Sequence, residues 1–99
     1  MNTQKLPFDK KLFNLVRLDI MMNLDGEPPI PFSELKAVCE LTDGNLSSHL
    51  RVLENLGFVS SYKSFVSRKP QTTYRITSRG KGQLEDLKDW LYQTFIEPG

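Results

Sequence analysis

The chain has little cysteine, little histidine and no long apolar run, and each scarcity excludes a class of protein. Its 99 residues include one cysteine, Cys39, and one histidine, His49. One cysteine cannot form an internal disulfide. One cysteine and one histidine together fall short of the four ligands that a tetrahedral zinc site needs. We therefore expect a protein of a reducing compartment, the cytoplasm, with no bound metal.

Segments that direct a chain into or across a membrane are also missing. Asn14, Arg17 and Asp19 interrupt the most apolar stretch, whereas a bilayer-spanning helix needs about 20 consecutive apolar residues. The start, Met1–Phe8, lacks the apolar run and small cleavage residues of a signal peptide. We expect no membrane partner and, because so short a chain cannot fill two hydrophobic cores, a single domain over residues 1–99.

No catalytic arrangement can be assembled from the residues present. A nucleophile needs a base, and His49 is the only side chain suited to that role. Gly80 and Gly82 do not follow the order of a phosphate-binding loop. The carboxylates between Glu85 and Asp89 are better explained by solubility and by the helix dipole than by acid-base chemistry. The sequence therefore predicts neither an enzyme nor a cofactor.

The net charge of +1 hides an uneven distribution along the chain. Residues 42–81 contain seven lysines and arginines against two carboxylates, a net charge of +5, and the remaining residues carry −4. Such asymmetry within a small domain indicates that one face meets a polyanion. A solvated charged surface explains the same pattern equally well.

Residues 9–24 predict an amphipathic helix. Its apolar stripe, with spacings of three and four, consists of Leu12, Leu15, Val16, Ile20 and Leu24. Further apolar residues lie outside this stripe: Phe13, Leu18, Met21 and Met22. One core contact does not need so much apolar surface, so a partner subunit is a candidate to cover the rest.

Residues 33–57 predict two short helices joined by a tight turn. Ser33 is expected to cap the first helix, which would bury Leu35, Val38 and Cys39. Thr42 is expected to cap the second helix, and Gly57 to end it. The apolar stripe of that second helix is Leu46, Leu50, Leu53 and Leu56. This pattern is typical of a helix-turn-helix.

The outer face of the second helix is small and polar, as a major groove roughly 12 Å wide requires. The candidate DNA contacts on and next to it are Thr42, Asp43, Gly44, Asn45, Ser47, Ser48, His49 and Arg51. An asparagine such as Asn45 can pair with adenine, Arg51 can meet guanine or phosphate, and Gly44 would let the backbone approach a phosphate. A merely solvated face is the alternative. For His49, a DNA contact and a packing role at the helix edge are equally favoured.

Residues 58–77 predict a β-hairpin, and residues 78–96 a closing helix capped by Thr77 or Ser78. Two β-prone runs flank a polar loop at 67–71, which a proline interrupts. The residues of the hairpin expected to reach DNA are Lys63, Ser67, Arg68, Lys69 and Arg75. Cations at a hairpin tip also serve solubility and edge protection, so the hairpin indicates DNA binding only together with the polar helix.

Three segments resemble the ArsR and MarR groups of winged-helix transcriptional regulators. LTDGNLSSHLRVLENLGFV at 41–59 resembles their recognition helix, KSFVSRKPQTTYRITSRG at 63–80 their wing, and FSELKAVC at 32–39 the helix before them. The resemblance implies an α+β, mainly helical fold. It consists of a winged helix-turn-helix with a two- or three-stranded antiparallel wing and a C-terminal dimerisation helix.

The same resemblance implies a homodimer that places two recognition helices in successive major grooves of double-stranded DNA. The residues it assigns to the dimer interface are Leu12, Phe13, Val16, Leu87, Trp90, Leu91 and Phe95. Metal-sensing ArsR members pair cysteines near the position of Cys39, but Ala37 stands there in this chain, so metal sensing is not expected. The sequence does not identify a small-molecule effector.

The sequence therefore predicts sequence-specific binding of double-stranded DNA by a dimeric transcriptional regulator. The main rival is a winged-helix module that packs against another protein and touches no DNA. The cationic hairpin favours DNA.

Overall fold

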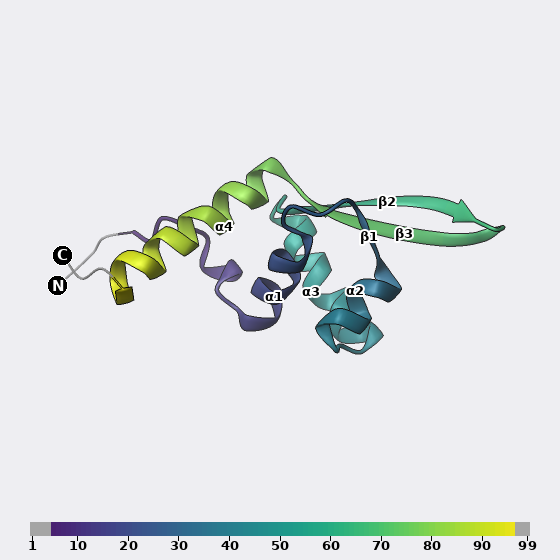
Figure 1. The fold of residues 1–99 in the computed structure, drawn as a ribbon, viewed down its shortest axis with the longest axis horizontal. Coiled ribbons are helices and arrows are strands. Elements are labelled where there is room, and N and C mark those ends of the chain that lie inside the picture. The colour runs from purple at the N-terminus through teal and green to yellow at the C-terminus, as the bar shows by residue number, and fades with distance from the viewer. Residues whose placement is uncertain (1–4, 97–99) are drawn as a thin grey trace.

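The computed structural model describes residues 5–96. Met1–Gln4, half of the segment in which no signal peptide is expected, lies outside the described residues. The molecule is elongated, with extents of 57 × 24 × 22 Å. Three helices form a central body, the hairpin of β2 and β3 projects from one side of it, and α4 extends to the other side (Figure 1). Within residues 5–96, no helix combines the length and apolar composition needed to cross a membrane.

The expected helix over residues 9–24 is interrupted, and in this respect the prediction was wrong. A 3-10 turn spans Lys10–Leu12, and α1 spans Leu15–Leu24. Between them, the Asn14 side chain accepts hydrogen bonds from the Val16 and Arg17 amides at 3.0 and 3.1 Å. Asparagine in this position satisfies backbone donors that an unbroken helix would satisfy itself, so a new helix begins there.

The two helices α2 and α3 span Phe32–Cys39 and Asp43–Asn55, which confirms the helix-turn-helix. Ser33 does not cap α2: the cap is Pro31, two residues earlier, and the fixed backbone of proline suits a helix start. Val38 was expected in the core but is exposed. Thr42 does cap α3, accepting from the Asn45 amide at 3.2 Å.

A three-stranded antiparallel sheet has the order β1-β3-β2, with β1 at Ile30–Pro31, β2 at Val59–Val66 and β3 at Lys69–Ile76. The loop expected over residues 67–71 is only two residues long, Ser67 and Arg68, and Pro70 lies within β3. Proline is tolerated because β1 pairs only with Thr73 and Tyr74, so the edge of β3 beside Pro70 is free and loses no ladder bond.

Helix α4 spans Ser78–Leu91 and continues as a π-helical turn over Tyr92–Ile96. Thr77 caps it, with its hydroxyl accepting from the Gly80 amide at 3.0 Å and donating to the Gly57 carbonyl at 2.6 Å. The first turn of α4 is thereby tied to the end of α3 and to the start of β2. The core shared by the helices and the base of the sheet includes Phe8, Leu12, Ile20, Met21, Leu24, Leu35, Leu46, Leu50, Leu53, Phe58, Leu84 and Leu87.

Candidate nucleic-acid interface

Helix α3 presents a polar outer face and buries its leucines. Leu46, Leu50 and Leu53 are at most 1% exposed. The exposed residues of this face are Thr42, Asp43, Gly44, Asn45, Ser47, Ser48 and Arg51. A Cβ added at Gly44 would meet no atom of the chain within 4 Å, so open space surrounds the first turn of α3. The helix therefore has the shape and the donors that a major groove accepts.

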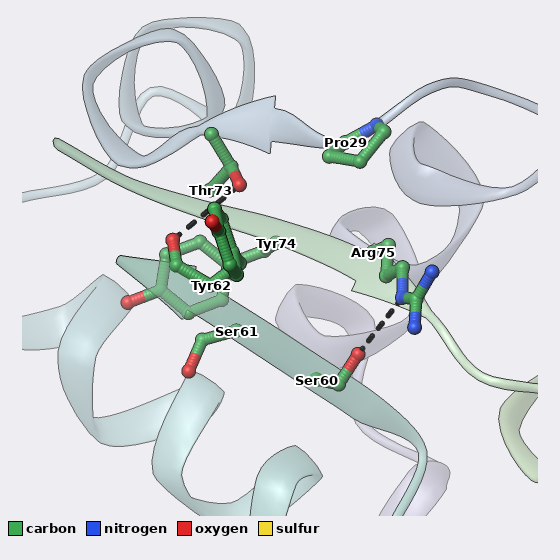
Figure 2. A pocket seen from close by; sticks show the side chains of 7 residues that line it. All are labelled: Pro29, Ser60, Ser61, Tyr62, Thr73, Tyr74 and Arg75. Carbon is green, nitrogen blue, oxygen red and sulfur yellow. Dashed lines mark hydrogen bonds between the residues drawn. The ribbon is translucent and has the colours of Figure 1, made fainter. Parts of the chain in front are cut away.

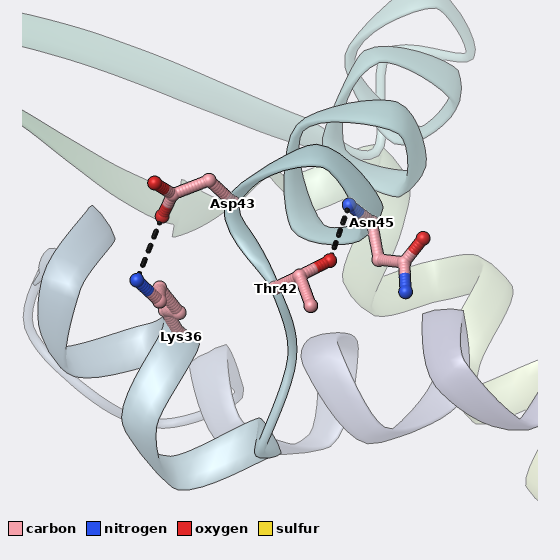
Figure 3. Close-up of polar contacts among 4 residues, drawn as sticks. All are labelled: Lys36, Thr42, Asp43 and Asn45. Carbon is pink, nitrogen blue, oxygen red and sulfur yellow. Dashed lines mark hydrogen bonds and ion pairs between the residues drawn. The ribbon is translucent and has the colours of Figure 1, made fainter.

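An ion pair joins the two helices of the motif. The Lys36 ammonium lies 2.9 Å from an Asp43 carboxylate oxygen, and the Asn45 side chain extends away from this pair (Figure 3). A carboxylate on this face would repel DNA phosphates, and the lysine offsets its charge. Asp43 is thus placed to orient α3 against α2. The sequence offered no signal for this role of Lys36 because the pairing crosses the turn between the helices.

His49 is anchored to the first helix. The Arg17 Nε donates to the His49 Nδ1 at 3.3 Å, and the Arg17 Nη1 donates to the Lys11 carbonyl at 2.7 Å. Burial lowers the pKa of His49 below its usual 6.5, and the charge of Arg17 lowers it further. The imidazole is therefore neutral at pH 7 with its proton on Nε2, which leaves a donor on its other edge. Sequence reasoning missed Arg17, which only the fold brings to α3.

The cations of the wing, the hairpin of β2 and β3, fall on two faces. Directly paired residues of an antiparallel ladder point to the same face. Lys69 pairs with Val66 and Arg75 with Ser60, so these two cations share one face, whereas Lys63 pairs with Thr72 on the other. The structure therefore does not bring all the predicted wing residues together.

The two-residue turn of the wing has an unusual backbone. Ser67 and Arg68 both have positive φ, 52° and 66°, where side chains other than glycine are disfavoured. Such a turn matches the twist of the flanking strands and makes a tight hairpin. It places the Arg68 side chain at the very end of the wing.

A hollow of about 310 Å³ lies along the base of the wing. Figure 2 shows its lining, where the Arg75 Nε donates to the Ser60 hydroxyl at 3.2 Å and the Thr73 hydroxyl to the Tyr62 carbonyl at 3.5 Å. Tyr74 completes the wall, and burial followed by the Glu54 charge raises its pKa. The Arg75 guanidinium is thus already engaged within the wing.

Cys39 and His49, the two candidate metal ligands, have other partners. The Cys39 thiol accepts from the Asn23 amide group at 3.7 Å, and burial, followed by the charge of Asp19, raises its pKa to about 11. In the described part of the chain, no three His, Cys, Asp or Glu side chains lie close enough together to hold a metal ion.

The residues assigned to a dimer interface fall into three groups by exposure. Leu12 and Leu87 are buried within the chain itself, at 0% and 1% exposure, and have no surface to offer a partner. Near the end of α4, Phe13 and Phe95 are exposed and each lies 6.4 Å from the Trp90 ring. Val16, Trp90 and Leu91 are half-buried. Tyr92 and Ile96, which sequence reasoning did not select, extend this exposed apolar surface.

Comparison with known proteins gives a consistent result. An uncharacterized protein of Methanocaldococcus jannaschii is 38% identical over 84 residues, which cover 84% of this chain and 88% of that protein. The solved structure of a transcriptional regulator homologue from Pyrococcus horikoshii OT3 is 40% identical, covers 89% of this chain and 91% of its own, and superposes with a TM-score of 0.74.

The structure of MarR shares the fold, with a TM-score of 0.65 at 22% identity, covering 89% of this chain and 69% of its own. The resemblance to winged-helix regulators is confirmed, and the family and fold are those of transcriptional regulators, not enzymes. The winged helix DNA-binding domain family matches residues 16–95, which is most of the sequence. The chain belongs to the winged helix DNA-binding domain family, as a DNA-binding regulator.

Proposed function

We propose that this protein binds double-stranded DNA sequence-specifically as a homodimer and regulates transcription, with α3 in a major groove and the wing against the neighbouring backbone. The observation that carries the proposal is the exposed polar face of α3 beside a hairpin that is rich in cations. Val59–Ile76 contains Lys63, Arg68, Lys69 and Arg75 and no Asp or Glu. DNA phosphates favour such a segment, whereas a neutral protein surface does not.

Within this proposal, the two elements have different tasks. Asn45, Ser48 and Arg51 would read base edges or fix the helix on phosphate. Arg68 and Lys69 would contact phosphates or the minor groove without regard to sequence. The neutral His49, with its free Nε2–H, is a further donor toward DNA, held in place by Arg17. A DNA partner also underlies the expectation of a cytoplasmic protein.

A gel-shift titration with salt tests DNA binding against the rival, a protein-interaction module. Binding through several phosphates should weaken steeply as salt rises, whereas a hydrophobic protein interface should not respond in this way. Arg68→Ala with Lys69→Ala should weaken binding to all sequences and lower the salt slope by about 2. The matched control removes two other exposed cations, Lys5 and Lys10, and should leave the slope unchanged. The proposal would be refuted if the affinity for duplex DNA did not change with salt and was the same for the wild-type protein and the wing double variant.

Sequence specificity is tested on α3. Asn45→Ala should relax the preference at one base position and cost about 1–3 kcal/mol there. DNA fragments selected by the purified protein and by the variant give both motifs, together with the half-site spacing. A dimer should select two half-sites about 34–36 Å apart, or a multiple of this distance. Identical motifs for the two proteins would remove Asn45 from base recognition.

Dimerisation is assigned to the exposed apolar surface at the end of α4. Phe95→Ala with Tyr92→Ala should shift the protein toward monomer in analytical ultracentrifugation, because apolar anchors carry most of an interface energy. Phe65→Ala is the matched control, since Phe65 on the wing is 77% exposed and Phe95 is 68% exposed. A dimer that persists in the Phe95 variant, or dissociates equally in the control, would contradict this assignment.

A further inference from the structure

The wing carries apolar side chains that the chain does not bury. Phe65 is 77% exposed and pairs directly across the ladder with Pro70, which is also exposed. Both lie within two residues of the turn, at the end of the hairpin that projects farthest from the helices (Figure 1). Exposed apolar side chains at the end of a projecting hairpin promote aggregation. Because these side chains also pack against no part of the core within residues 5–96, the stability of the fold does not explain them.

The geometry of the hairpin joins the two side chains into one patch. Because the turn has two residues, Val66 and Lys69 form the hydrogen-bonded pair that closes it. Phe65 and Pro70 are the next pair, which belongs to the non-hydrogen-bonded type with the closer side chains. Proline has no backbone N–H, so the patch has no donor at Pro70 that would have to be hydrogen-bonded by water.

Cations border the patch. Arg68 occupies the turn, and Lys63 lies two residues before Phe65 on the same face. Lys69, next to Pro70 in the sequence, points to the opposite face of the hairpin tip. No carboxylate occurs anywhere in the hairpin. An apolar tip with a cationic rim is complementary to a narrow groove lined by phosphates and floored by stacked bases, more than to the apolar groove of a protein.

Resting on the proposed binding of DNA, we propose that Phe65 and Pro70 form a wedge that enters the minor groove beside the recognition helix and partly unstacks a base step. Arg68 and Lys69 hold the wing against the phosphates while the ring inserts. Unstacking bends the duplex away from the protein-facing minor groove. The wedge also adds a preference for pyrimidine–purine steps at the flank, because these steps kink most easily.

The test uses a duplex selected by the purified protein, prepared as a series with 2-aminopurine at successive flanking positions. Wild-type protein should raise 2-aminopurine fluorescence at one flanking step and bend the duplex, as measured by energy transfer between end labels. Phe65→Ala should abolish both signals and lower the affinity roughly tenfold, as the loss of one stacking side chain does.

Tyr62→Ala is the matched control, because Tyr62 is 70% exposed on the opposite face of the same hairpin. It should keep the fluorescence change and the bend. Melting followed by circular dichroism verifies that both variants fold. A wild-type protein that binds without unstacking, or equal effects of the two variants, would overturn the wedge and leave DNA binding standing. Absence of any duplex binding by wild-type protein would overturn both proposals.

Discussion

Replacement of Gly80 by alanine tests the contact that fixes α4 to the rest of the fold. A Cβ at Gly80 would lie 2.2 Å from the Phe58 carbonyl oxygen and 3.0 Å from the Ile76 Cγ1. The carbonyl cannot swing aside, because it accepts the Thr77 amide at 3.0 Å. Helix α4 must therefore move outward by about 1 Å, which loosens the core in the way overpacking does.

The size of the effect follows from two contributions. Overpacking costs about 1–3 kcal/mol, and weakening the Thr77 cap about 1 kcal/mol more. Together, about 2–4 kcal/mol would be lost from a total stability of about 5–15 kcal/mol. For a domain of this size the melting temperature should fall by about 10–25 °C.

Gly82 provides a control within the same helix. An added Cβ there meets nothing within 4 Å. Gly82→Ala should therefore stabilise the protein by about 0.5–1 kcal/mol, since alanine is the better helix former. Thermal unfolding monitored by circular dichroism should show shifts of opposite sign for the two variants. A Gly80→Ala protein that melts at or above the wild-type temperature would refute the packing argument.

Three further predictions concern the helix-turn-helix. The folded-state pKa of His49 lies below its unfolded value of 6.5, so the stability contributed by neutral His49 is present above pH 6.5 and is lost as the pH falls further. Denaturant titrations from pH 7.5 to 5 should show this loss of unfolding free energy. His49→Gln should make the loss smaller. Thr42→Ala should cost about 1 kcal/mol of unfolding free energy, because the Asn45 amide loses its acceptor; an unchanged denaturation midpoint would contradict the cap. Cys39, with a thiol pKa near 11, should react with iodoacetamide at pH 8 far more slowly than after unfolding, and equal rates would contradict its burial.

Much of the framework could be predicted from sequence because it depends on local chemistry. The leucine stripe of α3, the Thr42 cap and the glycine at its end mark a helix whatever surrounds it. The two errors have different causes. A helix start at Asn14 was overlooked because an apolar periodicity continued across it, and Pro70 was assigned to a loop because its free edge became visible only with the pairing of β1.

What the sequence by itself determined is the order of the elements, the polar face of α3 and the cationic character of the wing, since spacing and capping act over a few residues. The tertiary structure alone decided which side chains meet. It placed Arg17 against His49, Lys36 against Asp43 and Gly80 against the Phe58 carbonyl. It also buried Leu12 and Leu87 while leaving Phe95 exposed. Contacts between distant segments depend on how the helices pack and on the register of the strands, and helical periodicity carries no information about either.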